Sequence, residues 1–158
     1  MAKFLNYMRK EGKTPLCTPT VPKSGGYALG GVGSITTAAR RAIQVTPKTE
    51  AFKKATARGR VGMFAINLTK SKVVTYVVLY GHTGGRKDAK QAEATNCLLK
   101  IAYEELDAQP KGPKILAGDF NVDPSELPFL QTMCQIDGWT DVGEKQKCGE
   151  AKVVSTHA

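Results

Sequence analysis

Apolar and polar positions in the middle of the chain follow a pattern typical of two neighbouring β-strands. Residues 61–68 alternate between two faces, and residues 73–80 form a β-branched run that is apolar on both faces. The polar residues 69–72 separate the two stretches. The pattern predicts a β-hairpin. Its second strand should be central in a sheet, because a strand that is apolar on both faces is usually buried on both faces.

Apolar residues at helical spacing predict a long helix over residues 88–108, with Asp88 near its start. Charged residues, Glu105 among them, are expected on its polar face. A short apolar run, residues 115–117, predicts a strand after this helix, and residues 125–135 predict a second amphipathic helix. The order strand, strand, helix, strand, helix is typical of a layered α/β domain.

The first part of the chain has a different composition. Residues 1–25 mix Pro and Gly with Thr and Lys, which predicts a basic tail without a regular element before a partial domain over residues 26–158. Residues 36–54 fit either the start of a helix or an extended segment. Residues 52–60 are predicted to be a connecting loop, and residues 152–158 have the pattern of a strand.

Length and composition limit the class of protein. A chain of 158 residues with 41% apolar content suits one domain with a packed core. No apolar run reaches about 18 residues, so we expect no membrane span, and the N-terminal residues lack the apolar segment of a secretory signal. The four widely spaced Cys residues favour reduced thiols in an intracellular rather than a secreted protein, and with 2 His they do not suggest a zinc site.

The net charge of +9 is unevenly distributed. Residues 1–60 hold 12 Lys and Arg against 2 acidic residues, whereas residues 61–158 hold 11 against 12. The excess of positive charge in the first part favours a polyanionic partner such as nucleic acid. A solvated basic segment without a partner fits the same pattern, and the charges alone do not distinguish the two.

Candidate functional residues stand at the ends of two predicted strands. Asp119 and Asn121 follow the apolar run 115–117, and residues two apart in a strand project to the same side. Tyr80 ends the predicted central strand. We therefore expect Tyr80, Asp119 and Asn121 to converge at one edge of a shared sheet, where α/β proteins commonly hold functional residues. Asp119 and Asn121 also fit an Asx turn, in which such side chains bind local backbone groups.

The motif Gly118-Asp119-Phe120-Asn121 resembles one of the endonuclease/exonuclease/phosphatase superfamily, which includes apurinic endonucleases, DNase I-like enzymes and retrotransposon endonucleases. The strand ending in Tyr80, the long helix after it and the Asp119–Asn121 strand end follow one another in the order of the family. Upstream, Gly30-Gly31-Val32-Gly33 resembles a Gly-Gly-Val strand of the family. The resemblance covers roughly residues 26–142. It implies a fragment of a four-layered α/β/β/α sandwich of the DNase I-like type. It also implies a metal-dependent phosphodiesterase that acts on nucleic acid, with DNA favoured over RNA.

The resemblance implies a role for each matching residue. The phenol of Tyr80 would lie close to the scissile phosphate, and Asp119 would orient or deprotonate the attacking water and bind Mg²⁺ or Mn²⁺. Asn121 would donate to the phosphate. Thr83 and Arg86, in the loop after Tyr80, would contact the phosphate backbone.

Other family residues have no counterpart in this sequence. Glu11 lacks the strand context of the metal-binding Glu, and Ser155-Thr156-His157 lacks the Asp of the closing Asp-His pair. We therefore expect a copy truncated at both ends, with weak magnesium binding and little or no activity alone. His82 is expected to be a surface or turn residue. Two alternatives stay open: a non-catalytic nucleic-acid-binding module that uses the basic first part, and a relative acting on a small phosphoester such as an inositol phosphate.

Overall fold

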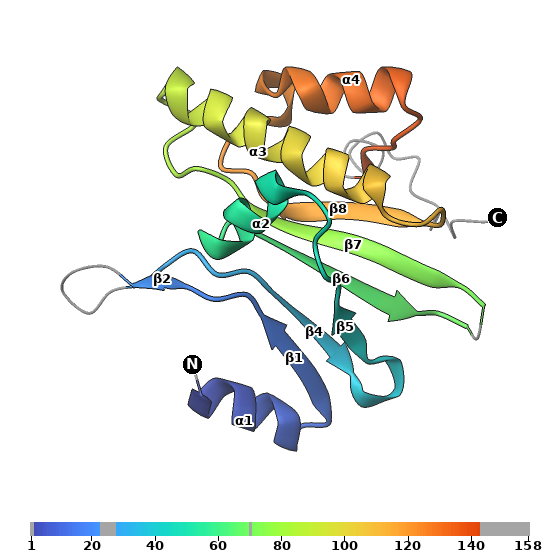
Figure 1. Ribbon diagram of the computed structural model, residues 1–158. Coiled ribbons are helices and arrows are strands. Elements are labelled where there is room, and N and C mark those ends of the chain that lie inside the picture. The colour runs from blue at the N-terminus through green and yellow to red at the C-terminus, as the bar shows by residue number, and fades with distance from the viewer. Residues whose placement is uncertain (1, 23–27, 70, 143–158) are drawn as a thin grey trace.

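The main sheet has four strands in the spatial order β5-β6-β7-β8 (Figure 1). The structure is a computed structural model that describes residues 2–22, 28–69 and 71–142 of a mixed α/β protein. The strands are β5 (Ala42–Gln44), β6 (Val61–Asn67), β7 (Val73–Tyr80) and β8 (Lys114–Asp119). The pairs β5–β6 and β6–β7 are antiparallel, and β7–β8 is parallel. The parallel pair requires a crossover, which the long helix α3 (Ala89–Ala108) supplies.

The predicted hairpin and its central strand are confirmed. Val61 pairs with Leu79 and Asn67 with Val73, so β6 and β7 run side by side along their whole length. The Leu68 N–H closes the turn by donating to the carbonyl of Lys72 at 2.8 Å. Because β7 has β6 on one side and β8 on the other, its apolar character on both faces matches its central place in the sheet.

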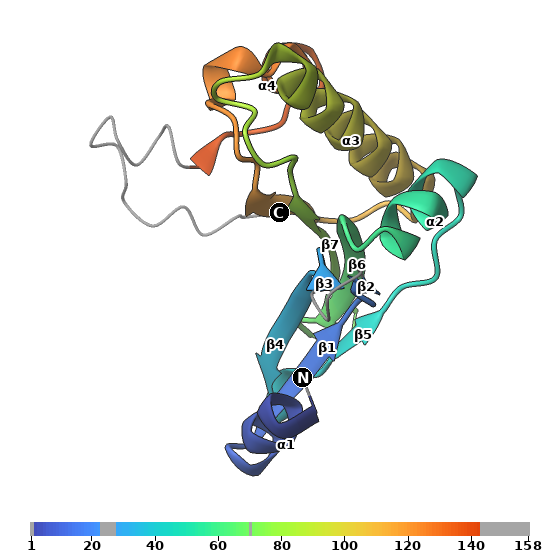
Figure 2. The same cartoon turned by 90° about the vertical axis from the view of Figure 1, so that its left-hand side faces the viewer.

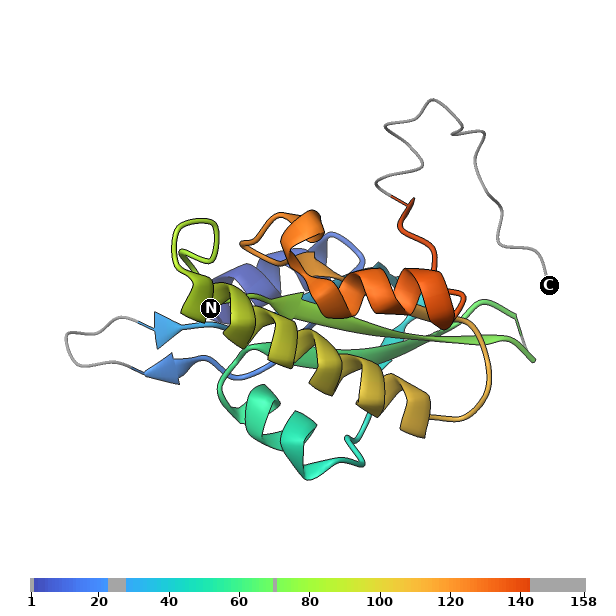
Figure 3. The ribbon, with the colours of Figure 1, turned by 90° about the horizontal axis from the view of Figure 1, so that it is seen from above.

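Helices cover one face of the main sheet (Figures 1 and 3). Helix α2 (Glu50–Ala57) and α3 lie on this face, and α4 (Pro128–Ile136) lies beside α3. The core between helices and sheet consists of apolar side chains that are almost completely buried: Phe52, Val61, Met63, Val77, Leu79, Leu99, Ala102, Leu106 and Met133. Burial of each large side chain contributes about 1.5–3 kcal/mol, so this cluster fixes the sheet under the helices.

A second, two-stranded sheet lies against the opposite face of the main sheet (Figure 2). It consists of β1 (Lys13–Cys17) and β4 (Gly33–Thr37), which pair antiparallel. The hydroxyl groups of Ser34 on β4 and Tyr76 on β7 form a hydrogen bond between the two sheets. Gly62 allows the close approach, because a Cβ there would lie 2.7 Å from a methyl group of Thr18. A further short pair joins β2 (Val21–Pro22) to β3 (Ala28–Leu29).

The prediction that residues 1–25 lack regular structure is wrong for the described part of that segment. It forms α1 (Ala2–Lys10), β1 and β2. Pro15 is tolerated within β1 because β1 pairs on one side only, with β4, so the missing N–H does not interrupt a central ladder. The division of the chain into a tail and a domain stays a prediction.

The loop predicted over residues 52–60 is also wrong, because α2 occupies most of it. Thr49 is its N-cap, and the Thr49 hydroxyl accepts the N–H of Phe52 at 3.3 Å. Phe52 and Ala55, three residues apart, are buried on the inner face of the helix. A capping Thr followed by two apolar residues at helical spacing was therefore the overlooked signal.

The remaining predicted elements are close to the observed ones. Asp88 is the N-cap of α3, as predicted, and its side chain accepts the N–H of Lys90 at 2.9 Å. The predicted second helix begins later than residue 125, because a 3₁₀ turn, η2 (Pro124–Glu126), comes before α4. The ambiguous segment holds a 3₁₀ turn, η1 (Ala38–Arg40), and the extended β5. The strand predicted over residues 152–158 lies outside the described residues. None of the helices in the described ranges is long and apolar enough to cross a bilayer.

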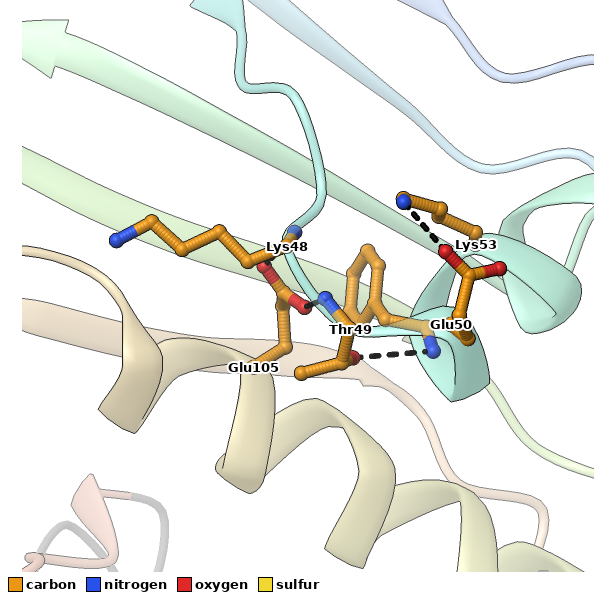
Figure 4. A network of polar contacts seen from close by, with 6 residues as sticks. Lys48, Thr49, Glu50, Lys53 and Glu105 are labelled. Carbon is orange, nitrogen blue, oxygen red and sulfur yellow. Dashed lines mark hydrogen bonds and ion pairs between the residues drawn. The ribbon is translucent and has the colours of Figure 1, made fainter.

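Glu105 lies in the interior rather than on the polar face of α3. Its side chain is fully buried and accepts the backbone N–H groups of Lys48 at 2.8 Å and Thr49 at 2.7 Å (Figure 4). The side-chain amide of Gln109 donates to it as well, at 2.6 Å. Glu105 thus anchors the segment that leads into α2 onto the last turn of α3.

Candidate functional site

Tyr80, Asp119 and Asn121 lie together at the ends of β7 and β8, as the sequence predicted. Tyr80 and Asp119 are direct register partners in the parallel pair. The Gly81 N–H donates to the backbone carbonyl of Asp119 at 2.7 Å, and the side-chain amide of Asn121 donates to the Gly81 carbonyl at 3.3 Å. We call Tyr80, Asp119 and Asn121 the strand-end site. Their proximity follows from the strand register, while their chemical roles stay predictions.

Two glycines allow the strand ends to approach this closely. A Cβ on Gly118 would lie 1.9 Å from the carbonyl oxygen of Leu79, and the φ of Gly118 is 154°. A Cβ on Gly81 would lie 2.0 Å from the carbonyl oxygen of Phe120. Neither position accepts a side chain without movement of the backbone. The glycines therefore fix the separation between Tyr80 and the Asp119–Asn121 turn.

The turn itself has the geometry of the Asx turn that the sequence left open. The Asn121 N–H donates to Oδ1 of Asp119 at 3.1 Å. Asn121 has a φ of 55°, in the left-handed region that costs a non-glycine residue about 1 kcal/mol. Asp119 is exposed, and its second carboxylate oxygen has no hydrogen bond to any residue that the structure describes. The backbone bonds therefore use one carboxylate oxygen of Asp119 and one amide N–H of Asn121.

Arg60 brings a positive charge to the strand-end site, which the sequence analysis missed. Its backbone carbonyl accepts the Tyr80 N–H at 2.8 Å, because Arg60 immediately precedes β6 and lies opposite Tyr80. Its guanidinium donates to the Gly81 carbonyl at 2.9 Å and lies 5.4 Å from the centre of the Tyr80 ring. The hairpin register could have predicted this, since it places the residue before Val61 opposite Tyr80.

Thr83 and Arg86 lie in the turn between β7 and α3 and are exposed. Their side chains form no hydrogen bond or ion pair with residues in the described ranges, so their predicted contacts with phosphate stay predictions. His82, expected to be a surface or turn residue, lies in the loop after β7 and is half-buried. Its backbone N–H donates to the hydroxyl of the buried Thr95 at 2.9 Å. Burial and the nearby charges of Arg60 and Arg58 lower the pKa of His82, so its imidazole is neutral at pH 7.

The residues at the strand ends offer limited ligation for a metal ion. Within residues 2–22, 28–69 and 71–142 no group of three or more His, Cys, Asp or Glu side chains could hold one. Magnesium can be bound through one or two carboxylates when water and substrate phosphate complete its shell. Asp119 supplies one carboxylate at this place, and the metal binding expected from the sequence stays a prediction.

Comparison with known proteins adds no family assignment: the sequence matches no protein-family model and no curated protein. The resemblance carried by Tyr80 and by Gly118–Asn121 therefore stays a hypothesis. A functional conclusion has to depend on the geometry at the ends of β7 and β8.

Proposed function

We propose that the strand-end site binds a phosphodiester and belongs to a divalent-metal-dependent phosphodiesterase domain that acts on nucleic acid. The observation that carries the proposal is the direct pairing of Tyr80 with Asp119, with Asn121 bonded to Gly81 beside them. A phenol, a carboxylate and an amide from two distant segments thus stand at neighbouring strand ends. These are the groups needed to donate to a phosphate and to accept a proton from water.

Each side chain has a defined part in the proposed chemistry. The hydroxyl of Tyr80 and the second amide N–H of Asn121 donate to non-bridging phosphate oxygens, and Arg60 adds a positive charge. Asp119 uses the carboxylate oxygen that the turn does not use to accept a proton from the attacking water. The P–O bond to the leaving nucleotide then breaks, and the leaving oxygen takes a proton from solvent. A bound Mg²⁺ or Mn²⁺ would supply neutralisation of the phosphate charge. Asp119 is the one carboxylate of the described residues that we assign to that ion, so we expect slow hydrolysis.

The arrangement of layers supports a DNase I-like sandwich as the fold of this proposed domain. Helices α2 and α3, the main sheet and the β1–β4 sheet follow one another as three layers (Figures 1 and 2). On the face of the main sheet opposite the helices, β8 carries Ile115, whose side chain is 51% exposed. A wider second sheet in a sandwich would cover that position.

The test combines binding and hydrolysis of labelled single-stranded and duplex DNA, with and without magnesium. Asp119→Asn keeps the acceptor for the turn but removes the proton-accepting carboxylate, so it should abolish the slow cleavage. Tyr80→Phe should weaken binding of the scissile strand. Asp107→Asn on α3 and Tyr7→Phe on α1 make the same chemical changes at exposed positions and serve as controls. Equal behaviour of site variants and controls would overturn the proposal.

A non-catalytic nucleic-acid-binding module is the second candidate, and the Asx turn favours it. Oδ1 of Asp119 and one amide N–H of Asn121 already bond to backbone groups, as in a purely structural turn. Salt-dependent DNA binding that is unchanged in Asp119→Asn and Asn121→Ala, without any hydrolysis, would support this candidate. Parallel assays with RNA and an inositol phosphate separate the substrate classes.

A further inference from the structure

A cavity of about 740 Å³ lies between α2 and α3, next to the strand-end site. Its apolar walls consist of Ala, Val, Leu and Ile side chains from the two helices and β2. Its polar lining is Lys54, Arg58, Arg60, His82 and Cys97, and we call the cavity lined by these five residues the basic groove. The volume falls within the range of small-molecule sites, about 300–1,000 Å³.

The charges of the basic groove are not balanced by acidic residues. No Asp or Glu of the described ranges lines it. Lys53, one residue before Lys54 on α2, forms an ion pair with Glu50 at 2.6 Å, whereas Lys54 and Arg58 form no ion pair with any carboxylate that the structure describes. Glu50, paired with Lys53, also feels the charge of Lys54. Cations that form no ion pair beside a cavity attract an anionic ligand.

The other two polar groups of the groove are uncharged. The lowered pKa of His82 leaves its imidazole uncharged at pH 7, with one N–H to donate. Burial and the hydrogen bond to Glu93 raise the pKa of Cys97, which stays a thiol. The groove therefore combines three positive charges, from Lys54, Arg58 and Arg60, with the neutral imidazole donor of His82 and an apolar wall. This combination suits a phosphate group attached to a less polar ring.

Arg60 and His82 connect the groove to the strand-end site. The Arg60 guanidinium donates to the Gly81 carbonyl and lies over the ring of Tyr80, and it also lines the groove. His82 is two residues after Tyr80 and lines the groove as well. A chain of nucleotides with one phosphate at the strand-end site could therefore place an adjacent nucleotide in the groove.

We propose that the basic groove binds a nucleotide of the nucleic-acid strand whose phosphodiester lies at the strand-end site. Lys54 and Arg58 hold its phosphate, and the apolar wall between α2 and α3 contacts its base. The inference rests on the proposed function and narrows it, because only a polymer can occupy the groove and the strand-end site at the same time. Free nucleotides share the same chemistry, so the test includes them.

Binding of a labelled short oligothymidylate, measured by fluorescence anisotropy in chelator without metal, tests the groove apart from hydrolysis. Lys54→Ala and Arg58→Ala should each weaken binding about three- to tenfold. Each should also make the slope of log K against log salt concentration less steep by about 0.7 for each lost phosphate contact. Lys53→Ala removes the same charge from the same helix outside the groove, and it should change binding less than about twofold. Equal losses in all three variants, or no loss in any, would overturn the proposal.

Thiol alkylation followed by peptide mass spectrometry locates the ligand. Oligothymidylate should slow alkylation of Cys97, which lines the groove, while the exposed Cys17 on β1 keeps its rate. Binding without protection of Cys97 would refute the groove and leave the proposed function standing. If adenosine monophosphate or inorganic phosphate protected Cys97 as strongly as the oligothymidylate, the proposal that the groove binds part of a nucleic-acid strand would be refuted. Hydrolysis unchanged in Asp119→Asn would refute the proposed function while leaving the metal-free groove result intact.

Discussion

Replacement of Glu105 by Gln is expected to lower the free energy of unfolding by about 2–3 kcal/mol at pH 7. The carboxylate is fully buried and accepts the N–H groups of Lys48 and Thr49 (Figure 4). It also accepts the side-chain amide of Gln109. Hydrogen bonds to a charged group contribute about 1.5–3 kcal/mol each. A glutamine can accept one backbone N–H, but its own NH₂ then faces the other donor. Glu105→Ala leaves all three donors without this partner and should cost about 3–5 kcal/mol.

The loss should depend on pH in a defined direction. Burial alone raises the pKa of Glu105, but the hydrogen bonds from Lys48, Thr49 and Gln109 outweigh it and hold the pKa below its ordinary value of 4.5. A pKa lowered by folding stabilises the protein above the unfolded-state pKa, and this contribution is lost as the pH falls through the folded-state pKa. The difference in the free energy of unfolding between wild type and Glu105→Gln should therefore have its full size at pH 7 and shrink as the pH falls below 4.5.

Urea unfolding followed by the fluorescence of Trp139, the single Trp, measures the loss of stability and its dependence on pH. Trp139 packs beside Tyr103 at the edge of the core, so it reports on the helical layer. Glu104→Gln is the matched control, because Glu104 precedes Glu105 on α3 and is exposed, with a side-chain exposure of 51%. It should change stability by less than about 0.5 kcal/mol. Equal effects at the two positions, or a Glu105→Gln difference that does not shrink in acid, would refute the reasoning.

Three further predictions concern the strand-end site. Gly118→Ala should lower the free energy of unfolding, measured by thermal unfolding, by about 3 kcal/mol or more, because its Cβ would meet a carbonyl oxygen at 1.9 Å. Gly84→Ala is the control: this residue has a φ of 94° and open space around it, so the loss should be only about 1 kcal/mol. Asn121→Gly should leave stability within about 1 kcal/mol, since relief of its left-handed strain offsets the lost hydrogen bond, yet DNA binding should fall. Arg60→Leu should weaken DNA binding by about 1–2 kcal/mol in anisotropy titrations, and the exposed Arg40→Leu should have a smaller effect.

Local patterns in the sequence were sufficient for the hairpin, α3 and β8. Alternation with period two, helical spacing and a capping Asp88 each act within a few residues, so they can be recognised without knowledge of the fold. The elements that were missed depend on distant partners. Pro15 fits a strand only because β4 is present to pair with it, and Glu105 is buried only because Lys48 and Thr49, 57 and 56 residues away, donate to it.

The sequence by itself placed Tyr80 at the end of one strand and the Asp119–Asn121 turn at the end of another. Only the tertiary structure decided that these ends are register partners, that Arg60 lies over Tyr80, and that Lys54 and Arg58 line a groove beside them. The physical reason is that side-chain alternation along a strand is a local property, whereas the neighbour across a sheet or between two helices depends on how the whole core packs.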